Sequence, residues 1–209
     1  MSDKPWSIHI VHPYTYKFDG KTNVIGQIAR FSVRDTKIKA ILENSLGIEV
    51  PLICHWNKPQ GTLEGALCTT GLFMDPNFES LFDDRVINLT TTPYGIPLDD
   101  ERPKNIPLDR WDVITRYYDT VSSMKKKLPQ TERVLFLGGV YENCLVNCVS
   151  HFNDNFMAPN QILYVCPDLS VSIVPEEYSR CRNILLSKGV QEITADEAIP
   201  SVSRERIVA

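Results

Sequence analysis

Apolar residues along this chain are arranged in two ways, as short β-rich runs and as longer segments with helical spacing. The β-rich runs predict strands at 7–11, 50–56, 85–89, 134–137, 161–166 and 190–194. Apolar residues that recur every three or four positions predict helices at 31–46, 108–128, 143–152 and 175–187. The stretch 57–84 is mixed and rich in turn formers, and 90–107 is proline-rich and predicts a long irregular loop.

Strands that alternate with helices predict a single α/β domain over residues 1–209. We expect three layers, α/β/α, with a mostly parallel central sheet of the Rossmann-like kind and helices on both faces. Ligands of such sheets bind at the carboxyl ends of the strands. The residues predicted to lie at strand carboxyl ends are His12, Trp56, Leu89, Gly138 and Pro167.

The composition is that of an ordinary globular protein, with 43% hydrophobic and 23% charged residues. The formal net charge of -4 gives no basic footprint for nucleic acid, and no apolar run is long enough to suggest a membrane span. The N-terminus lacks the apolar region of a signal peptide, so the six cysteines are expected to be reduced thiols. These features predict a cytoplasmic protein.

The segment 133–148 carries the strongest chemical signal in the sequence. A buried strand is followed by Gly138 and Gly139, and Cys144 falls in the first turn of the predicted helix. Unpaired N–H groups and the helix dipole favour negative charge there, so we expect a thiolate with a lowered pKa. The same N–H groups are suited to hold a developing oxyanion.

The second half of the chain, about 108–195, resembles the isochorismatase-like cysteine hydrolases, a superfamily that includes nicotinamidases and carbamoyl-amide hydrolases. A strand, a glycine at 138, five residues and a cysteine match its nucleophile motif. The resemblance continues in Leu163-Tyr-Val-Cys-Pro-Asp168 and in Gly189-Val-Gln-Glu-Ile-Thr194. It implies an isochorismatase-like fold with Cys144 as the nucleophile. Aligning Gly139-Val-Tyr with the isochorismatase motif instead would put Leu145 at that position, and we prefer Cys144.

The resemblance also implies a Cys–Asp–Lys triad, which this chain does not reproduce. His12 stands where the family has its aspartate, and Lys104 is the nearest substitute for the lysine by sequence order. A Cys–His pair is a recognised way to generate a thiolate. The fold implies an oxyanion site at the N–H groups of Val140 and Cys144, with a cis peptide bond between Gly139 and Val140. The family's Asp-x-His metal pattern is absent, so we expect no metal and no cofactor.

These residues support one leading function and two alternatives. The leading hypothesis is a hydrolase of a small amide, imide or related molecule, with Cys144 as nucleophile and His12 as its activator. A catalytically inactive relative, acting as a ligand-binding or oligomeric scaffold, is the main alternative. A redox or metal role for Cys144, Cys148 and His151, which share a helix face, is the third. Relatives commonly associate, so we expect a homo-oligomer with a small-molecule ligand.

Four of these residues also have ordinary structural interpretations. His12 precedes a proline and is also explained as a strand-end residue. Cys144 is also explained as a small buried hydrophobe, because free cysteine is among the most buried residue types. Lys104 lies in a charged, proline-rich loop and is equally explained as a solvated side chain. Asp168 is expected to be a structural acceptor at a strand end.

Overall fold

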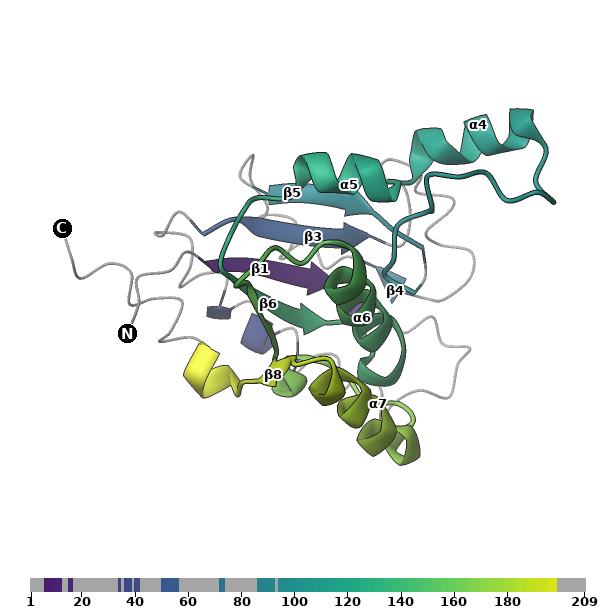
Figure 1. Ribbon diagram of the computed structural model, residues 1–209. Helices are drawn as coiled ribbons and strands as arrows, with labels where there is room; N and C mark the ends of the chain where they lie inside the picture. The colour runs from purple at the N-terminus through teal and green to yellow at the C-terminus, as the bar shows by residue number, and fades with distance from the viewer. Residues whose placement is uncertain are drawn as a thin grey trace.

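A six-stranded parallel sheet forms the centre of the molecule (Figure 1). The computed structural model describes residues 6–12, 15–16, 34, 36–38, 40–41, 50–56, 72–73, 86–92 and 94–198. The strand order is β5-β3-β1-β6-β7-β8. The strands are β1 (Trp6–Val11), β3 (Leu52–Trp56), β5 (Val86–Thr90), β6 (Arg133–Gly138), β7 (Ile162–Val165) and β8 (Gln191–Glu192). The predicted mostly parallel sheet is confirmed.

Apolar clusters cover both faces of the sheet. The helices are α4 (Leu108–Tyr117), α5 (Val121–Lys127), α6 (Val146–Asn155) and α7 (Pro175–Ser187). Residues of α5, α6 and α7 join one buried cluster, and Ile38 and Ile41 join the cluster on the opposite face. Successive residues of β1 divide between them, with Ile10 in one and Val11 in the other. The predicted three-layer α/β/α architecture is therefore confirmed.

The strand order changes direction between β1 and β6. From β1 the chain builds outward to β3 and β5, and it then returns to the other side of β1 with β6, β7 and β8. This reversal is the topological switch point, where parallel sheets open a crevice at their carboxyl edge. β1 ends at Val11 opposite Gly138 of β6, so His12 and the glycine turn both emerge at this point.

The helix predicted over 108–128 is two helices. Its centre is drawn to the sheet edge, because the Asp119 N–H donates to the Thr90 carbonyl at 2.8 Å. Thr120 then caps α5 by a reciprocal pair of bonds with Ser123. Tyr118 is extended and ends α4. The apolar periodicity continued across this break, so the sequence pattern did not reveal it.

Most of the other boundaries fall close to prediction. The helix at 175–187 has its predicted bounds, and the strand predicted at 190–194 is shorter, at Gln191–Glu192. A small antiparallel pair, β2 (Thr15–Tyr16) and β4 (Leu72–Phe73), was not predicted. The described residues between 34 and 41 are helical, whereas the ends of the helix predicted at 31–46 and most of 57–84 lie outside the described residues. No helix in the described ranges is long and apolar enough to cross a membrane.

Candidate active site

Cys144 lies directly after the glycine turn that ends β6. Gly138 and Gly139 both have positive φ, 83° and 63°, and this turns the chain sharply away from the strand. A π-helix, Tyr141–Leu145, follows and runs into α6. The helix therefore begins two residues before the predicted start at Asn143. Single π-turns of this kind occur frequently at functional sites.

The sulfur of Cys144 is held by the backbone of the turn. The Val140 N–H donates to Sγ at 3.0 Å, and Sγ lies 3.7 Å from the Val140 carbonyl oxygen. The peptide bond predicted to be cis between Gly139 and Val140 is trans, because no cis bond occurs among the described residues. The positive φ angles of Gly138 and Gly139 orient the Val140 N–H toward the sulfur without a cis peptide bond. The N–H predicted to hold an oxyanion thus contacts the sulfur itself.

Burial governs the ionisation of Cys144. The residue is 4% exposed, and loss of hydration raises the pKa of its thiol. The Val140 N–H, the Arg34 charge and the N–H groups of Cys144 and Leu145 lower that pKa, but they do not outweigh burial. Our expectation of a lowered pKa at the helix start is therefore wrong. In this structure Cys144 is a thiol at neutral pH.

His12 is a buried, neutral imidazole at the carboxyl end of β1. Burial is the main cause that lowers its pKa to about 4, with the charge of Arg34 acting in the same direction. A hydrogen bond with the backbone of Thr92 acts in the opposite direction. Its φ of 47° is unusual for a residue other than glycine, and such outliers cluster at functional sites. The imidazole is therefore neutral at pH 7, and its lowered pKa makes it a weaker base than a solvated histidine.

Arg34 is the site residue that the sequence analysis did not identify. Its side chain is 2% exposed, and its charge lowers the pKa of both Cys144 and His12. One cation therefore acts on the thiol and on the imidazole, which places all three in one electrostatic environment. A signal was present, because Arg34 stands at positions i−4 and i−7 relative to the apolar Ile38 and Ile41. A charge within a buried helix stripe indicates a functional or paired group.

The loop after β5 packs against the helix that carries Cys144. A Cβ at Gly95 would lie 2.9 Å from the Cys144 carbonyl oxygen and 2.9 Å from Cys148 Cβ. The same Cβ would lie 3.4 Å from Val11 Cγ1, so the loop, the end of β1 and α6 meet at one point. Cys144 is 4% exposed, so a substrate reaches its sulfur only if the residues around it move.

A chain of buried polar side chains runs beneath the site. His9 Nδ1 and His55 Nε2 are 3.0 Å apart, and His55 Nδ1 lies 3.7 Å from the sulfur of Cys148. Burial lowers the pKa of both imidazoles, to about 3 for His55. Burial also raises the pKa of Cys148, and the nearby Cys144 acts in the same direction. All of these groups are neutral at pH 7.

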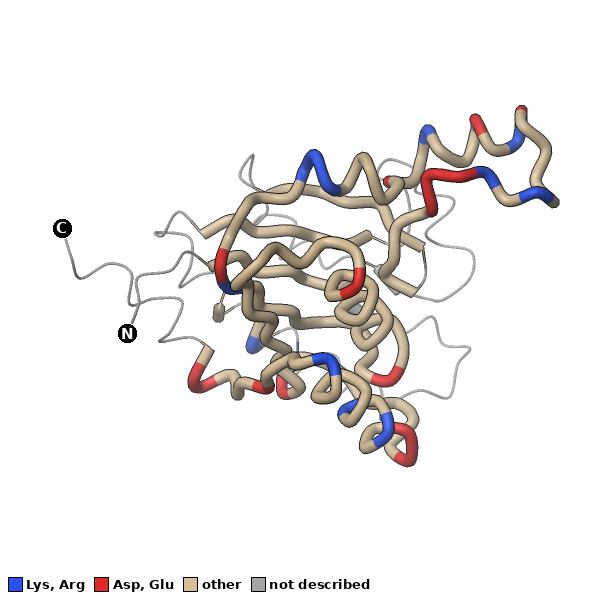
Figure 2. The backbone as a smooth tube through the Cα atoms, viewed as in Figure 1, with Lys and Arg blue, Asp and Glu red and all other residues tan. Residues whose placement is uncertain are grey.

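The remaining candidate residues lie elsewhere. Lys104 is exposed on the segment that leads to α4, which extends away from the sheet (Figure 2). His151 packs on Phe156, with ring centroids 5.7 Å apart. Across the described residues, no three His, Cys, Asp or Glu side chains are placed to share a metal ion. Asp168 accepts from the Ala195 N–H at 3.1 Å, the structural role expected for it.

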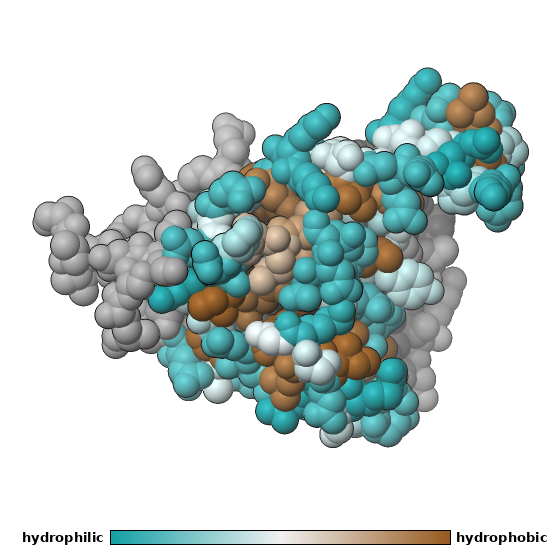
Figure 3. Space-filling model, viewed as in Figure 1, coloured by the Kyte–Doolittle hydropathy of each residue, from teal (hydrophilic) through white to brown (hydrophobic). Residues whose placement is uncertain are grey.

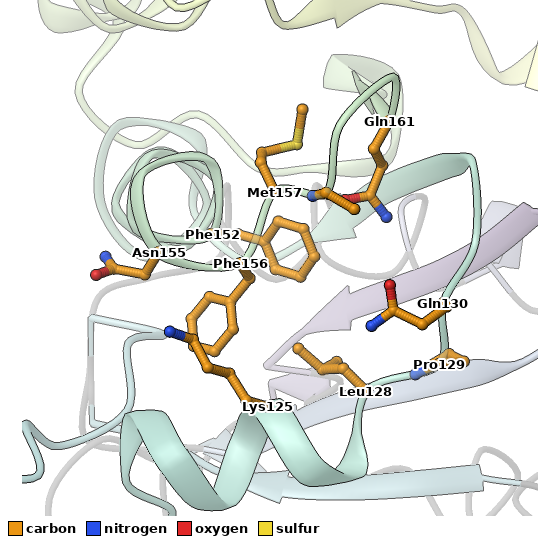
Figure 4. Close-up of a pocket in the computed structure, with 10 residues that line it drawn as sticks. Lys125, Leu128, Pro129, Gln130, Phe152, Asn155, Phe156, Met157 and Gln161 are labelled. Atoms are coloured by element: carbon orange, nitrogen blue, oxygen red, sulfur yellow. The ribbon is translucent and has the colours of Figure 1, made fainter.

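A separate hollow of about 380 Å³ lies between α5 and the end of α6 (Figure 4). Its apolar side chains include Leu128, Phe156 and Met157, and Lys125 lies 5.8 Å from the Phe156 ring centroid. The lining residues precede β6 and β7, at the amino-terminal edge of the sheet. The hollow is therefore at the opposite edge from Cys144 and is not part of the candidate site.

No protein-family model matches the sequence, and no curated protein matches it. Solved structures do match. An isochorismatase-like hydrolase from Alkaliphilus metalliredigens superposes with a TM-score of 0.58 at 12% identity, covering 96% of this chain and 99% of that one. The MAR1 ribonuclease from Caenorhabditis elegans superposes with a TM-score of 0.59 at 11% identity, covering 100% of this chain and 93% of that one. The YcaC gene product from Escherichia coli is an octameric hydrolase of unknown specificity. It superposes with a TM-score of 0.56 at 14% identity, covering 98% of this chain and 82% of that one.

The parallel six-stranded sheet, with a cysteine at its switch point, defines an α/β protein of the three-layer class. Within that class the structural neighbours identify the isochorismatase-like fold. At 11–14% identity the likeness establishes this fold, and the chemistry has to be argued from the residues of this chain.

Proposed function

We propose that this protein is a cysteine-dependent hydrolase of a small amide, imide or related molecule, with Cys144 as the nucleophile. The observation that carries the proposal is the hydrogen bond from the Val140 N–H to Cys144 Sγ, at 3.0 Å. The charge of Arg34, which lowers the pKa of both Cys144 and His12, supports it. The formal net charge of -4 offers no footprint for phosphates, so we favour a small molecule over RNA as substrate.

The proposed reaction begins with a neutral thiol and a neutral imidazole. As the sulfur attacks the carbonyl carbon, its proton passes to His12, and Arg34 stabilises the thiolate character of the sulfur. The sulfur leaves the Val140 N–H as it bonds to carbon, which frees that N–H and the Cys144 N–H for the oxyanion. Collapse of the tetrahedral intermediate expels the amine, which takes up the proton from His12. Water then hydrolyses the thioester and restores the Cys144 thiol. Arg34 takes the place that we assigned to Lys104.

Alkylation by iodoacetamide tests the nucleophile without knowledge of the substrate. We expect Cys144 to be alkylated at least tenfold faster than Cys54 and Cys166, which lie in the same chain and whose pKa values burial also raises, to about 12 for Cys166. His12→Asn should slow the alkylation of Cys144 at least tenfold at pH 7. Asparagine tolerates the positive φ of this position but is not a base. Lys104→Ala is the matched control and should change nothing.

Two results would overturn these assignments. If Cys144 is alkylated no faster than Cys54, it is a buried hydrophobe and not a nucleophile. If His12→Asn leaves the rate unchanged, His12 does not take the proton. Mass spectrometry of the separate cysteine peptides measures each rate.

A catalytically inactive relative is the second candidate function. The upward shift of the Cys144 pKa by burial favours it, since a buried thiol that stays protonated at neutral pH is not a reactive site. In that case the fold serves as a ligand-binding or oligomeric scaffold. The same alkylation experiment separates the two, because an inactive relative has a Cys144 that behaves as Cys54 does.

We also propose a cytoplasmic homo-oligomer. The cysteines in the described residues are free thiols, as a reducing compartment requires. The octameric hydrolase among the structural neighbours supports self-association. Sedimentation velocity of the full chain would show whether it is a monomer in solution.

A further inference from the structure

Residues 99–117, here called the α4 arm, leave the body of the molecule and return to the point where they left. The Leu98 N–H donates to the Asp119 carbonyl at 2.9 Å, and the Val121 N–H donates back to the Leu98 carbonyl at 2.9 Å. Between these anchors the chain extends outward and forms α4 (Figure 1). The arm is therefore a looped-out segment whose two ends are joined by backbone hydrogen bonds.

The arm exposes large apolar side chains. Leu108 is 63% exposed, and Val113 and Tyr117 are each 50% exposed. Val113 and Tyr117 are four residues apart and share one face of α4, whereas Trp111, the buried residue of α4, lies on the other side. Apolar residues are visible at the tip of the extension in Figure 3. A ten-residue helix is only marginally stable in water without tertiary packing.

We propose that the α4 arm is the surface through which this chain associates with a second copy of itself, arm against arm. The inference rests on the homo-oligomer proposed above for its choice of partner. Burial of the Val113–Tyr117 face supplies the hydrophobic contribution, and the two-fold axis of such a dimer presents the same face from both copies.

The charges of the arm favour a second copy over a strongly charged partner. The arm carries five acidic and four basic residues, so its net charge is close to zero and two arms repel each other only weakly. α4 carries Asp109 in its first turn and Arg116 in its last turn. Antiparallel pairing places each Asp109 beside the other copy's Arg116 and opposes the two helix dipoles.

Analytical ultracentrifugation of the full chain at about 1–100 µM tests the arm. We expect the wild-type chain to associate and the Val113→Glu/Tyr117→Glu double variant to raise the dissociation constant by at least about tenfold, since buried aromatic contacts dominate interfaces. Both side chains are already half exposed, so the double variant should keep its fold by far-UV circular dichroism. Leu186→Glu, on α7 at 40% exposure, is the matched control and should associate as the wild type does.

A second variant guards against a double variant that fails to fold. Replacing residues 99–118 with Gly-Ser-Gly joins Leu98 to Asp119, which are already bonded, and should give a folded monomer. A wild-type chain that is monomeric at 100 µM overturns the proposal, as does a double variant that associates like the Leu186→Glu control. Cys144 alkylation, measured on the same samples, reports the proposed chemistry separately.

Discussion

The Val140 N–H donates to the sulfur of Cys144 at 3.0 Å, so the resting thiol occupies a donor that an oxyanion would need. This contact makes the two roles of the turn sequential. The N–H group first orients the sulfur, and it becomes available only when the sulfur has bonded to carbon. The glycine turn thus ties the position of the nucleophile to the availability of the oxyanion site.

Removing the Arg34 charge should raise the pKa of Cys144 and slow its alkylation. Arg34→Met keeps the chain length and removes the cation, and a rise of one pKa unit lowers the thiolate fraction about tenfold at pH 8. Arg34→Lys keeps the charge and should lose less than half of that effect. The pH profile of the alkylation rate measures both.

The Arg34 variants carry their own control in His12. Arg34 lowers the pKa of His12. Arg34→Met should therefore raise the pKa of the His12 imidazole as well as that of the Cys144 thiol. NMR titration of the His12 ring follows the first shift. Equal profiles for Arg34→Met and Arg34→Lys would mean that the Arg34 charge does not act on the site.

Gly139→Ala should displace the Cys144 sulfur. An added Cβ would lie 2.9 Å from Sγ at a residue with φ of 63°, so both the contact and the backbone conformation oppose it. We expect a loss of about 1–2 kcal/mol in the free energy of unfolding and at least a tenfold change in the alkylation rate of Cys144. Urea unfolding and peptide mass spectrometry measure the two effects.

Gly189→Ala is the control for Gly139→Ala. Gly189 has a φ of 80°, but a Cβ there meets nothing within 4 Å. It should show the backbone penalty without a change at Cys144. An identical effect of both substitutions on alkylation would rule out the proposed contact with the sulfur.

Acid should destabilise the protein through its buried histidines. The pKa of His55 is lowered to about 3 and that of His12 to about 4, whereas an unfolded histidine titrates near 6.5. Below about pH 6.5 the unfolded chain therefore binds protons that the folded chain does not. Their contribution to stability is complete above that pH and is lost as the pH falls toward the folded values, by up to about 1.4 kcal/mol per pH unit for each histidine.

The slope between pH 6.5 and 5 identifies the histidines, because carboxylates titrate mainly below that window. His55→Leu removes one titrating group and should flatten the dependence of the unfolding free energy on pH. Urea unfolding at several pH values measures it. An unchanged slope in His55→Leu would show that His55 takes up its proton at the same pH in the folded protein as in the unfolded chain.

Asp119→Ala should destabilise the fold without altering the site. Its carboxylate accepts from the Thr90 N–H and the Ser123 hydroxyl, each at 2.8 Å, and from Lys127 at 2.6 Å. Leaving the Thr90 N–H without its acceptor should lower the free energy of unfolding by about 1–3 kcal/mol.

Lys127→Met separates the ion pair from the hydrogen bonds of Asp119. The lysine side chain is 45% exposed, so solvent screens the pair and we expect a loss below about 0.5 kcal/mol. Thermal unfolding compares the two variants. A loss in Lys127→Met as large as that in Asp119→Ala would mean that the ion pair, and not the hydrogen bond to the Thr90 N–H, joins β5 to α5.

The fold was predictable because periodicity and strand alternation are local properties of the sequence. The strands and the helix at 175–187 follow from the spacing of apolar residues. The break at 118–120 was not predictable, since it depends on a bond between Asp119 and the distant Thr90. The trans bond at Val140 was missed for a similar reason, because a resemblance supplied the expectation and two left-handed glycines determine the geometry.

The site was predictable only in part. The position of Cys144 after a strand and a glycine turn is visible in the sequence, and His12 was expected at the end of the first strand. The ionisation state of Cys144 could not be predicted, because its burial depends on which parts of the chain pack around the helix. Arg34 was missed although it interrupts an apolar stripe, since periodicity alone does not say that a charge points inward.

The joined ends of the α4 arm have an evolutionary consequence. Backbone hydrogen bonds join Leu98 to Asp119, so insertions and deletions between them should leave the strand order and the turn at Cys144 unaffected. Descendants of such a protein are free to exchange this stretch and acquire new associations while the ancestral chemistry persists. Sequence divergence among its homologues should therefore concentrate between these two residues.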